Sequence, residues 1–341
     1  TGFQVLYSFA QLGQYSNTSF QLGTDGYVYG STQYSANGIQ NGTLFKFKSD
    51  FSEYYHLKEF GGTDGTIPQS IALSNDGYIY GNTNQGGQYG GGTIFRIRKD
   101  GTNYQVLYHF AFNGTGKIIL GMDGKVYGHS YHGGVNDDGV LYRLEADGSL
   151  TILHDFQPAE GRPNGHITEY APGIIAGVCY SGGAYGYGSV FKVNTDGTGF
   201  HVMKSFGYGD GHTPTGRLLY YNGLLYGGTT GGGSVANTGL LFSINPQNDA
   251  YQILHEFAAD NSEGSYFNGG LSVGLDGYFY GGTFYGGDLS IPSGGGGTIF
   301  KIDTTGNFTV LRTLSATDGY RINREPLLLP DGNLMFSTYY N

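Results

Sequence analysis

The most regular feature of the chain is a short hydrophobic stretch that alternates with polar positions and returns throughout the sequence. Its copies end at Phe9, Phe60, Phe110, Phe156, Phe206, Phe257 and Leu314, at intervals of 46 to 57 residues. A repeat of this length accommodates four short β-strands, which is the size of one blade of a β-propeller. The spacing therefore predicts a propeller.

Each repeat contains four stretches that read as strands. In the second repeat they are Gln69–Asn75, Tyr78–Thr83, Thr93–Lys99 and Tyr104–Phe110. Asp-Gly or Asn-Gly pairs join the first strand to the second, and Asp-Gly pairs often join the third to the fourth; such pairs favour the tight turns of antiparallel hairpins. The second and third strands are joined by longer glycine-rich loops. These loops share one face of the ring with the crossovers between repeats, so we expect a functional site on that face.

Counting the repeats predicts a closed ring of seven blades. The tail from Arg324 to Asn341 supplies two strands, and Gly2–Phe9 reads as the last strand of a blade without the three before it. We expect this N-terminal strand to join the C-terminal blade, because closure removes exposed sheet edges. The predicted fold is thus an all-β, seven-bladed propeller of four-stranded antiparallel blades, forming one domain over residues 1–341. That closing blade lacks its third strand, and an open six-bladed array is the alternative.

Composition agrees with an all-β fold and limits the partners. The chain is rich in glycine, tyrosine and phenylalanine (64, 31 and 22 residues), and only 13% of it is charged. A net charge of −10 argues against a nucleic acid or an anionic membrane as the partner of the whole molecule. One cysteine, Cys179, excludes an internal disulfide framework, and no run of 18 apolar residues predicts a membrane span. Because the chain starts at Thr1, we infer a trimmed or mature product.

The repeat resembles a known family of tandem repeats. The residues that carry the resemblance are Asp76-Gly77, Tyr80-Gly81, Gly92–Phe95 and Val106–Phe110, with further copies at Gly188–Lys192 and Gly297–Lys301. They are similar to the choice-of-anchor (GloVer-type) repeat of extracellular bacterial proteins, and the similarity covers nearly the whole chain. It implies an exported or cell-surface propeller. It implies no reaction, since the shared residues serve turns and packing.

The histidines fall into two groups by their place in the repeat. Five lie on the last strand of a repeat and are expected to be solvated: His56, His109, His154, His201 and His255. Four lie on the loop face in the third to fifth repeats: His129, His132, His166 and His212. The second group marks the candidate site.

Basic residues add to this group. Aligning the repeats on the Asp-Gly turn places Lys117 and His166 at the same position, early in the first strand, which lines the channel of a propeller. Arg162, Arg217, Arg321 and Arg324 lie in or beside the crossovers. Several departures from the repeat on one face indicate a single pocket.

The chemistry that these residues favour is β-elimination on a uronate-containing polysaccharide. Such a reaction needs a cation for the carboxylate, a base for the C5 proton and an acid for the leaving oxygen. The predicted catalytic residues are His129, Tyr131, Arg162 and His166. The predicted substrate-binding residues are Lys117, His132, Tyr180, His212, Arg217, Arg321 and Arg324. Seven-bladed propeller lyases with His, Tyr and Arg sites exist, which is a similarity of fold alone. We expect an extracellular monomer that needs no cofactor.

Three alternatives stay open. Hydrolysis by two carboxylates would draw on Asp137, Asp138, Glu160, Asp210 and Glu263. A lectin would stack sugars on Tyr34, Tyr89, Tyr131, Tyr185 and Tyr285. A metal site from His129, His132, Asp137 and Asp138 is disfavoured, because positions i and i+3 of a strand point to opposite faces. Calcium bound by loop carbonyls and aspartates is a further alternative.

Overall fold

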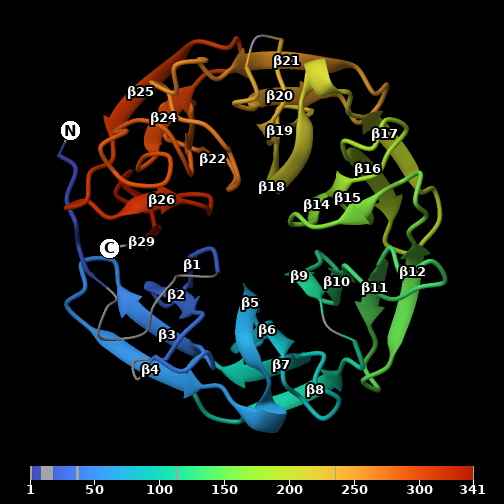
Figure 1. The fold of residues 1–341 in the computed structure, drawn as a ribbon. Coiled ribbons are helices and arrows are strands. Elements are labelled where there is room, and N and C mark those ends of the chain that lie inside the picture. Colours follow the sequence, from blue (N-terminus) through green and yellow to red (C-terminus); the bar gives the residue numbers. More distant parts are fainter. Residues whose placement is uncertain (1, 9–17, 36–37, 113, 235, 341) are drawn as a thin grey trace.

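Antiparallel β-sheets stand around a central axis as the blades of a propeller (Figure 1). The structure is a computed structural model that describes residues 2–8, 18–35, 38–112, 114–234 and 236–340. Within them the helical elements are two short 3-10 turns, Gly62–Asp64 and Tyr208–Asp210. In this part of the chain, no helix has the length and apolar character to cross a membrane.

Six blades are complete, and consecutive strands of the chain pair within each except at the split innermost strand of blade 4. Blade 1 contains β1 (Gln21–Leu22), β2 (Tyr27–Thr32), β3 (Thr43–Lys48) and β4 (Tyr54–Glu59). Blade 2 contains β5 (Thr66–Leu73), β6 (Tyr78–Gln85), β7 (Thr93–Arg98) and β8 (Gln105–His109). Blade 3 contains β9 (Thr115–Leu120), β10 (Val126–Ser130), β11 (Val140–Leu144) and β12 (Leu150–Asp155).

In the second half of the chain, blade 4 differs because its innermost strand is split in two. It contains β13 (Arg162–Pro163), β14 (Thr168–Ala171), β15 (Ile174–Ser181), β16 (Ser189–Asn194) and β17 (His201–Ser205). Blade 5 contains β18 (His212–Tyr221), β19 (Leu224–Gly231), β20 (Leu240–Ile244) and β21 (Tyr251–Glu256). Blade 6 contains β22 (Ser272–Val273), β23 (Phe279–Gly282), β24 (Thr298–Ile302) and β25 (Phe308–Thr313).

The prediction of seven four-stranded blades is wrong in its count. The sector between blades 6 and 1 holds a closing segment, residues 320–340 (Figure 1). It forms two separate two-stranded sheets, from β26 (Tyr320–Ile322) with β29 (Thr338–Tyr340) and from β27 (Leu327–Leu328) with β28 (Leu334–Met335). The repeat has lost its third strand here, so no four-stranded sheet can form.

The predicted closure by an N-terminal strand is not shown either. Residues 2–8 contain no strand, and Phe9 lies outside the described residues. The segment nevertheless contacts both neighbouring blades: the guanidinium of Arg312 in β25 lies 4.2 Å from the Phe3 ring, and Tyr7 stacks on Phe51 at 4.7 Å. Side-chain packing, rather than strand pairing, therefore connects it to blades 6 and 1.

Two motifs of the repeat have clear physical roles. The aspartate of the Asp-Gly turn binds the tyrosine of the following Tyr-Gly pair; for example, the hydroxyl of Tyr127 donates to Asp123 Oδ2 at 2.8 Å. The glycine of the Tyr-Gly pair lies under an aromatic ring of the third strand. A Cβ at Gly81 would come within 2.3 Å of Cζ of Phe95, its partner in the register of β6 and β7.

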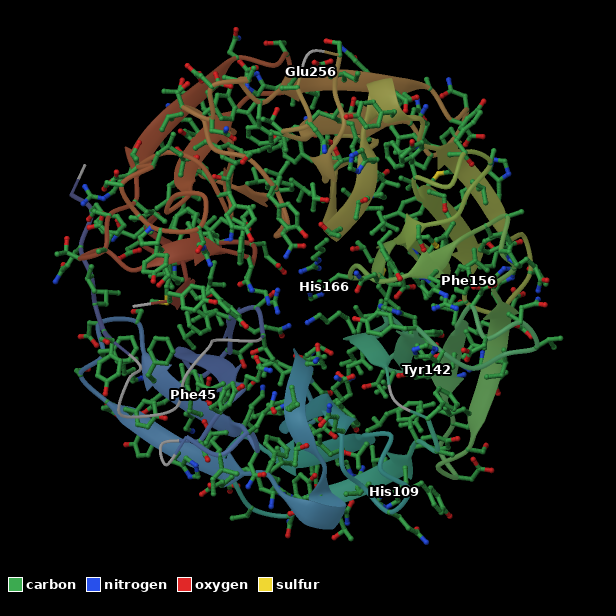
Figure 2. All side chains as sticks on the ribbon, viewed as in Figure 1. Phe45, His109, Tyr142, Phe156, His166 and Glu256 are labelled. Atoms are coloured by element: carbon green, nitrogen blue, oxygen red, sulfur yellow. The ribbon has the colours of Figure 1, made fainter. Side chains whose placement is uncertain are left out.

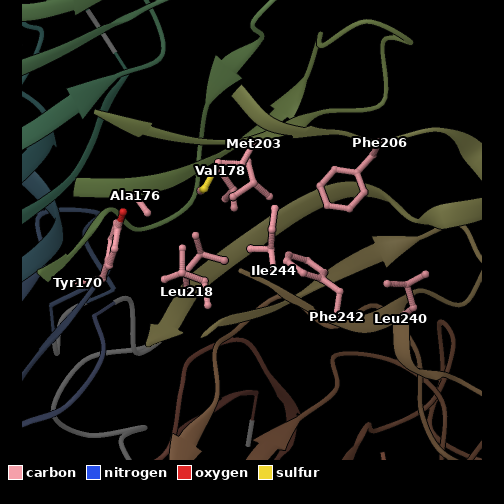
Figure 3. Close-up of a cluster of buried hydrophobic side chains, with 11 residues drawn as sticks. Tyr170, Ala176, Val178, Met203, Phe206, Leu218, Leu240, Phe242 and Ile244 are labelled. Atoms are coloured by element: carbon pink, nitrogen blue, oxygen red, sulfur yellow. The ribbon is translucent and has the colours of Figure 1, made fainter. Parts of the chain in front are cut away.

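The hydrophobic core is divided among the interfaces between blades. One cluster joins blades 4 and 5 through Phe206, Phe242, Leu218 and Val178, all at most 2% exposed (Figure 3). The phenylalanine that ends a hydrophobic stretch enters such a cluster at Phe60, Phe110, Phe156, Phe206 and Phe257, each at most 3% exposed. Burial of large aromatic side chains explains why this position recurs with the repeat.

Two histidines of the outer strands, His154 and His255, are not simply solvated, in contrast to the prediction, whereas His56 and His201 are exposed as predicted. His154 stacks on Phe200 at 3.5 Å, and its Nε2 lies 2.8 Å from Glu160 Oε2. His255 stacks on Phe308 at 4.0 Å and contacts Glu263 in the same way. They occupy the position at which other blades place a lysine or arginine that pairs with an acid of the crossover, so their role is to fasten blades together.

Candidate functional site

A channel runs along the axis of the ring, lined by the innermost strands, and holds two cavities. The larger, of ≈ 790 Å³, is lined mainly by aliphatic side chains and extends toward the hairpin turns. The smaller, of ≈ 170 Å³, lies on the loop face. His166 and Glu325 line both, and Figure 2 shows His166 close to the axis.

The smaller cavity is strongly polar. Its ionisable lining residues are Lys117, Tyr131, His166, Arg324 and Glu325. Side-chain amides complete the wall: Gln69, Asn164, Asn268 and Asn323. Basic groups therefore outnumber the one carboxylate of this cavity, although the chain as a whole carries a net charge of −10. A local excess of basic groups favours an anionic ligand.

Three of these residues occupy one position of the repeat. Lys117, His166 and Glu325 each lie six residues before the residue that precedes the glycine of the first hairpin turn, and that residue is aspartate in most repeats. The equivalent residues of the other repeats are uncharged: Ser19, Ser70, Gly216 and Gly270. The sequence analysis missed Glu325, although the same alignment, extended to the last repeat, would have found it.

The interruption of the innermost strand brings His166 to the channel. The pairing of blade 4 stops after Pro163 and resumes at Thr168. Between them the amide of His166 donates to the carbonyl of Gly216 in blade 5, at 3.1 Å. Gly165 is needed for this close approach, because a Cβ there would lie 2.6 Å from the same carbonyl oxygen.

The surroundings of His166 hold its imidazole in the neutral form. Burial lowers the pKa of His166 to about 3. The Glu325 carboxylate opposes this shift, while the positive charges of Lys117, Arg324 and Arg217 add to it. At neutral pH the ring therefore has a free lone pair.

Glu325 is the fixed anion of the site. Burial would raise the pKa of its carboxyl, but the charges of His166 and Arg217 and the Ser19 hydroxyl outweigh burial and lower it to about 2. Ser19 Oγ donates to Oε2 at 2.8 Å, and Arg217 Nη1 lies 3.7 Å from Oε1. Since His166 is neutral above about pH 3, Arg217 and Ser19 are the partners that remain at neutral pH.

The other three ionisable groups are also perturbed by burial. Lys117 is 6% exposed, its Nζ donates to the Gln69 carbonyl at 2.7 Å, and burial followed by the charge of Arg324 lowers its pKa well below the usual range. Burial also lowers the pKa of the Arg324 guanidinium and raises the pKa of the Tyr131 phenol. The phenol is thus a proton donor at neutral pH.

Two predicted catalytic residues do not reach the cavity. His129 is 0% exposed and its Nε2 donates to the Gly165 carbonyl at 2.7 Å; the Lys117 amide lies 3.2 Å from the same nitrogen, but a carbonyl only accepts, so Nε2 carries the hydrogen. Its Nδ1 has no partner among the described atoms. Arg162 forms an ion pair with Asp138, with Nε and Oδ1 3.0 Å apart.

The remaining predicted binding residues divide in the same way. Arg217 and Arg324 face the channel, whereas His132 lies in an exposed loop with its Nδ1 3.0 Å from Asp137 Oδ2. Arg321 is 8% exposed, and its Nη2 donates to the Pro292 and Ser293 carbonyls. His212 and Tyr180 are half-buried and line neither cavity.

The candidate metal ligands do not converge. His132 and Asp137 contact each other, but His129 is buried behind the cavity and Asp138 pairs with Arg162. Among the described residues no group of three or more His, Cys, Asp or Glu side chains is arranged to hold a metal ion.

Comparison with known families places the chain. A family model described as the Gloeobacter/Verrucomicrobia repeat matches residues 1–179 and 113–341. The chain therefore belongs to this repeat family, as the sequence resemblance indicated. The sequence has no significant match among curated proteins.

Solved structures share the fold at low sequence identity. The extracellular domain of a putative one-component system from B. thetaiotaomicron matches with a TM-score of 0.68 at 13% identity, over 99% of this chain and 39% of that one. A GH74 xyloglucanase from Xanthomonas campestris matches with a TM-score of 0.65 at 14% identity, over 96% of this chain and 51% of that one. An oligogalacturonate lyase from Vibrio parahaemolyticus matches with a TM-score of 0.60 at 13% identity, over 89% of this chain and 79% of that one. The chain is thus similar to propellers that include carbohydrate-active enzymes, and spans well under half of the first of them.

Proposed function

We propose that this member of the Gloeobacter/Verrucomicrobia repeat family is an extracellular carbohydrate-active propeller that cleaves an acidic polysaccharide by β-elimination. One observation carries the proposal: the smaller cavity combines a neutral histidine, a protonated tyrosine and buried basic side chains. These are the base, the acid and the carboxylate-binding groups that elimination from a uronate requires. The oligogalacturonate lyase of the same fold supports the proposal by analogy alone.

Binding begins with the carboxylate of the sugar. Arg324 and Lys117 supply donors on the cavity wall, and Arg217 stands at the far side of Glu325. A planar guanidinium can bind a carboxylate through two parallel hydrogen bonds. Neutralising the carboxylate makes the C5 proton more acidic. The cavity volume of ≈ 170 Å³ lies below the range of about 300–1,000 Å³ of typical ligand pockets, so we assign it one sugar unit.

His166 and Tyr131 then carry out the proton transfers. His166 takes the C5 proton, the electrons of that C–H bond form the C4–C5 double bond, and the C4–O bond breaks. Tyr131 protonates the departing oxygen, and the two side chains afterwards exchange the proton to return to their starting forms. The bound carboxylate partly cancels the charges of Lys117 and Arg324, which raises the basicity of His166 when substrate is present.

The other predicted residues have no substrate contact in this proposal. His129 and Arg162 line neither cavity, so we keep them out of the catalytic set. Hydrolysis by two carboxylates is disfavoured, because Glu325 is the one carboxylate among the lining residues of the smaller cavity.

Product analysis tests the reaction. Incubation with a panel of uronate-containing polysaccharides should give unsaturated ends that absorb in the near ultraviolet. His166→Ala should lower the rate by about 10²–10⁴-fold, the usual contribution of a general base. His56→Ala is the matched control, because His56 lies exposed on the outer strand β4, and it should leave the rate unchanged.

Each other product pattern contradicts elimination. New reducing ends without unsaturation would indicate a hydrolase. Binding of a glycan without any cleavage would indicate a lectin. Equal rates for the His166→Ala variant and the wild type would remove His166 from the mechanism.

A further inference from the structure

Three aromatic rings meet on the loop face at the interface of blades 4 and 5. Tyr187 lies in the loop between β15 and β16, Tyr208 in the crossover, and His212 at the start of β18. The Tyr187 and Tyr208 rings each lie 5.6 Å from the His212 ring, tilted by 35° and 34°. Their own centroids are 6.0 Å apart. We call these three residues the aromatic platform.

We propose that the aromatic platform is a sugar-stacking subsite that holds the part of the polysaccharide extending from the smaller cavity. The placement of the chain end rests on the function proposed above; the affinity of the platform for sugar rings does not.

The three-ring set of the platform is missing from three other interfaces between blades. Aligned on the glycines that flank them, the equivalent residues are Asn41, Gly62 and Thr66 between blades 1 and 2, and Thr238, Asn261 and Ser265 between blades 5 and 6. Between blades 3 and 4 they are Asp138, Pro158 and Arg162, which include an ion pair. Residues needed for the fold recur from one interface to the next, so a set of three rings that is missing from these three interfaces indicates a local function.

Hydrogen bonds at both ring nitrogens hold the His212 ring in one orientation beside the two tyrosines. Nε2 donates to Asn237 Oδ1 at 2.6 Å, an oxygen that also accepts from the Gly232 amide, and Thr213 Oγ1 donates to Nδ1 at 3.0 Å. A rigid ring loses little conformational entropy when a ligand stacks on it.

The two tyrosines are open to solvent. Tyr187 is 39% exposed and Tyr208 is 53% exposed. Because both side chains are at the surface, each hydroxyl can donate to or accept from a ligand. The nearby carboxylate of Asp210 is already bound to Lys204 and to the Gly207 amide. The surface offered is therefore aromatic, hydroxylated and without a free charge.

A pyranose ring has the complementary surface. One of its faces is a layer of C–H bonds, which the negative face of an aromatic ring attracts, and its rim carries hydroxyls. An aliphatic protein segment would leave the tyrosine hydroxyls unpaired. A nucleic acid would bring phosphates to a surface that has no free cation among the described residues of the platform.

The platform is connected directly to the cavity. His212 and Thr215 both belong to β18, and Thr215 lines the smaller cavity. Three residues of extended strand cover about 10 Å. A chain whose terminal acidic sugar occupies the cavity thus has its following sugars within reach of the platform.

The test compares glycan binding and cleavage for Tyr208→Ala, Tyr187→Ala and Tyr208→Phe. The wild type and each variant are applied as labelled proteins to an array that carries acidic and neutral oligosaccharides, from disaccharides to longer chains. Tyr55→Ala is the control, because Tyr55 is a tyrosine on the outer strand β4 that is 46% exposed and belongs to none of the proposed sites. Circular dichroism and the melting temperature verify the fold of each variant.

We expect Tyr208→Ala and Tyr187→Ala to weaken binding of the longer oligosaccharides by about tenfold each, in line with one aromatic contact. Binding of disaccharides should not change, Tyr208→Phe should retain most of the affinity, and Tyr55→Ala should match the wild type. Wild-type affinity of both alanine variants for every bound glycan, or no glycan binding by the wild type, would overturn the subsite. Platform-dependent binding without unsaturated products would instead overturn only the elimination reaction.

Discussion

His166 shows how the channel changes the chemistry of a single side chain. Four histidines were predicted on the loop face, but only His166 combines access to the cavity with a ring of charged neighbours. His129 comes directly before a glycine-rich loop, yet its ring donates to the Gly165 carbonyl and is completely buried. The difference lies in what each ring contacts, and residue type alone does not reveal it.

The lowered pKa of His166 predicts an unusual pH dependence. A histidine in water, with a pKa near 6.5, becomes protonated and inactive as a base between pH 7 and 5. The pKa of His166, about 3, keeps the free enzyme in the neutral, active form over this range. We expect kcat/KM on a short acidic oligosaccharide to change by less than about twofold from pH 7 to pH 5.

The pH profile can be checked without relying on activity. Titration of the imidazole signals by NMR, with His166→Ala to assign the signal of His166, should show no change of this ring above pH 5. A midpoint near 6.5 in either experiment would mean that the channel does not desolvate the ring and that the proposed state of the base is incorrect.

At the scale of single elements, the regular strands build the scaffold and the interrupted ones build the site. The innermost strand of blade 4 is broken at the residues that line the cavity, and the register of β18 shifts between Thr215 and Leu219 in blade 5. Elsewhere the Tyr-Gly pair and its covering aromatic ring keep strands two and three in register. The glycines of these pairs are therefore set by packing.

Replacing such a glycine should destabilise the blade. In Gly81→Ala the new Cβ would lie 2.3 Å from the Phe95 ring, so the ring or the strand must move. Overpacking of this kind costs about 1–3 kcal/mol in free energy of unfolding. Gly209→Ala is the control, since no atom lies within 4 Å of a Cβ built there. Chemical denaturation measures both, and equal stability of the two variants would contradict this account of the Tyr-Gly motif.

At the scale of the whole molecule, the closing segment joins the two ends of the blade array. Leu329 and Met335 pack into the core of blade 1 with Val28, Phe45 and Phe47. Ser19 of the first repeat binds Glu325 of the last, so this contact contributes to the ring and to the site together.

Arg321 is expected to hold the closing segment to blade 6. Its guanidinium lies 5.1 Å from the rings of Tyr285 and Tyr340 and donates to the carbonyls of Pro292 and Ser293. Arg321→Leu would leave these carbonyls without their donor and should lower the free energy of unfolding by about 2–3 kcal/mol. Lys125→Met, at an exposed position, should change it by less than about 0.5 kcal/mol. Similar melting temperatures for the two variants would show that closure depends on other contacts.

The sequence by itself determined the architecture of the blades. The spacing of the phenylalanine-ended stretches, the Asp-Gly turns and the Tyr-Gly pairs are local or nearest-neighbour features, because each repeat packs mainly on itself and the next. For blade 2 it placed the four strands close to their observed bounds. It did not determine the number of complete blades, since that depends on whether residues from opposite ends of the chain pair.

Only the tertiary structure decided which departures from the repeat form one site. Lys117, His166 and Glu325 come from different repeats, and the closed channel brings them onto one cavity with Arg324. In the sequence, Arg162 and Arg321 were candidates for the site like Arg324. In the structure, Arg162 instead pairs with Asp138, and Arg321 contacts aromatic side chains such as Tyr285. The physical reason is that channel access depends on backbone interruptions and on the folded neighbours of each charge, which arise from contacts between residues far apart in the chain.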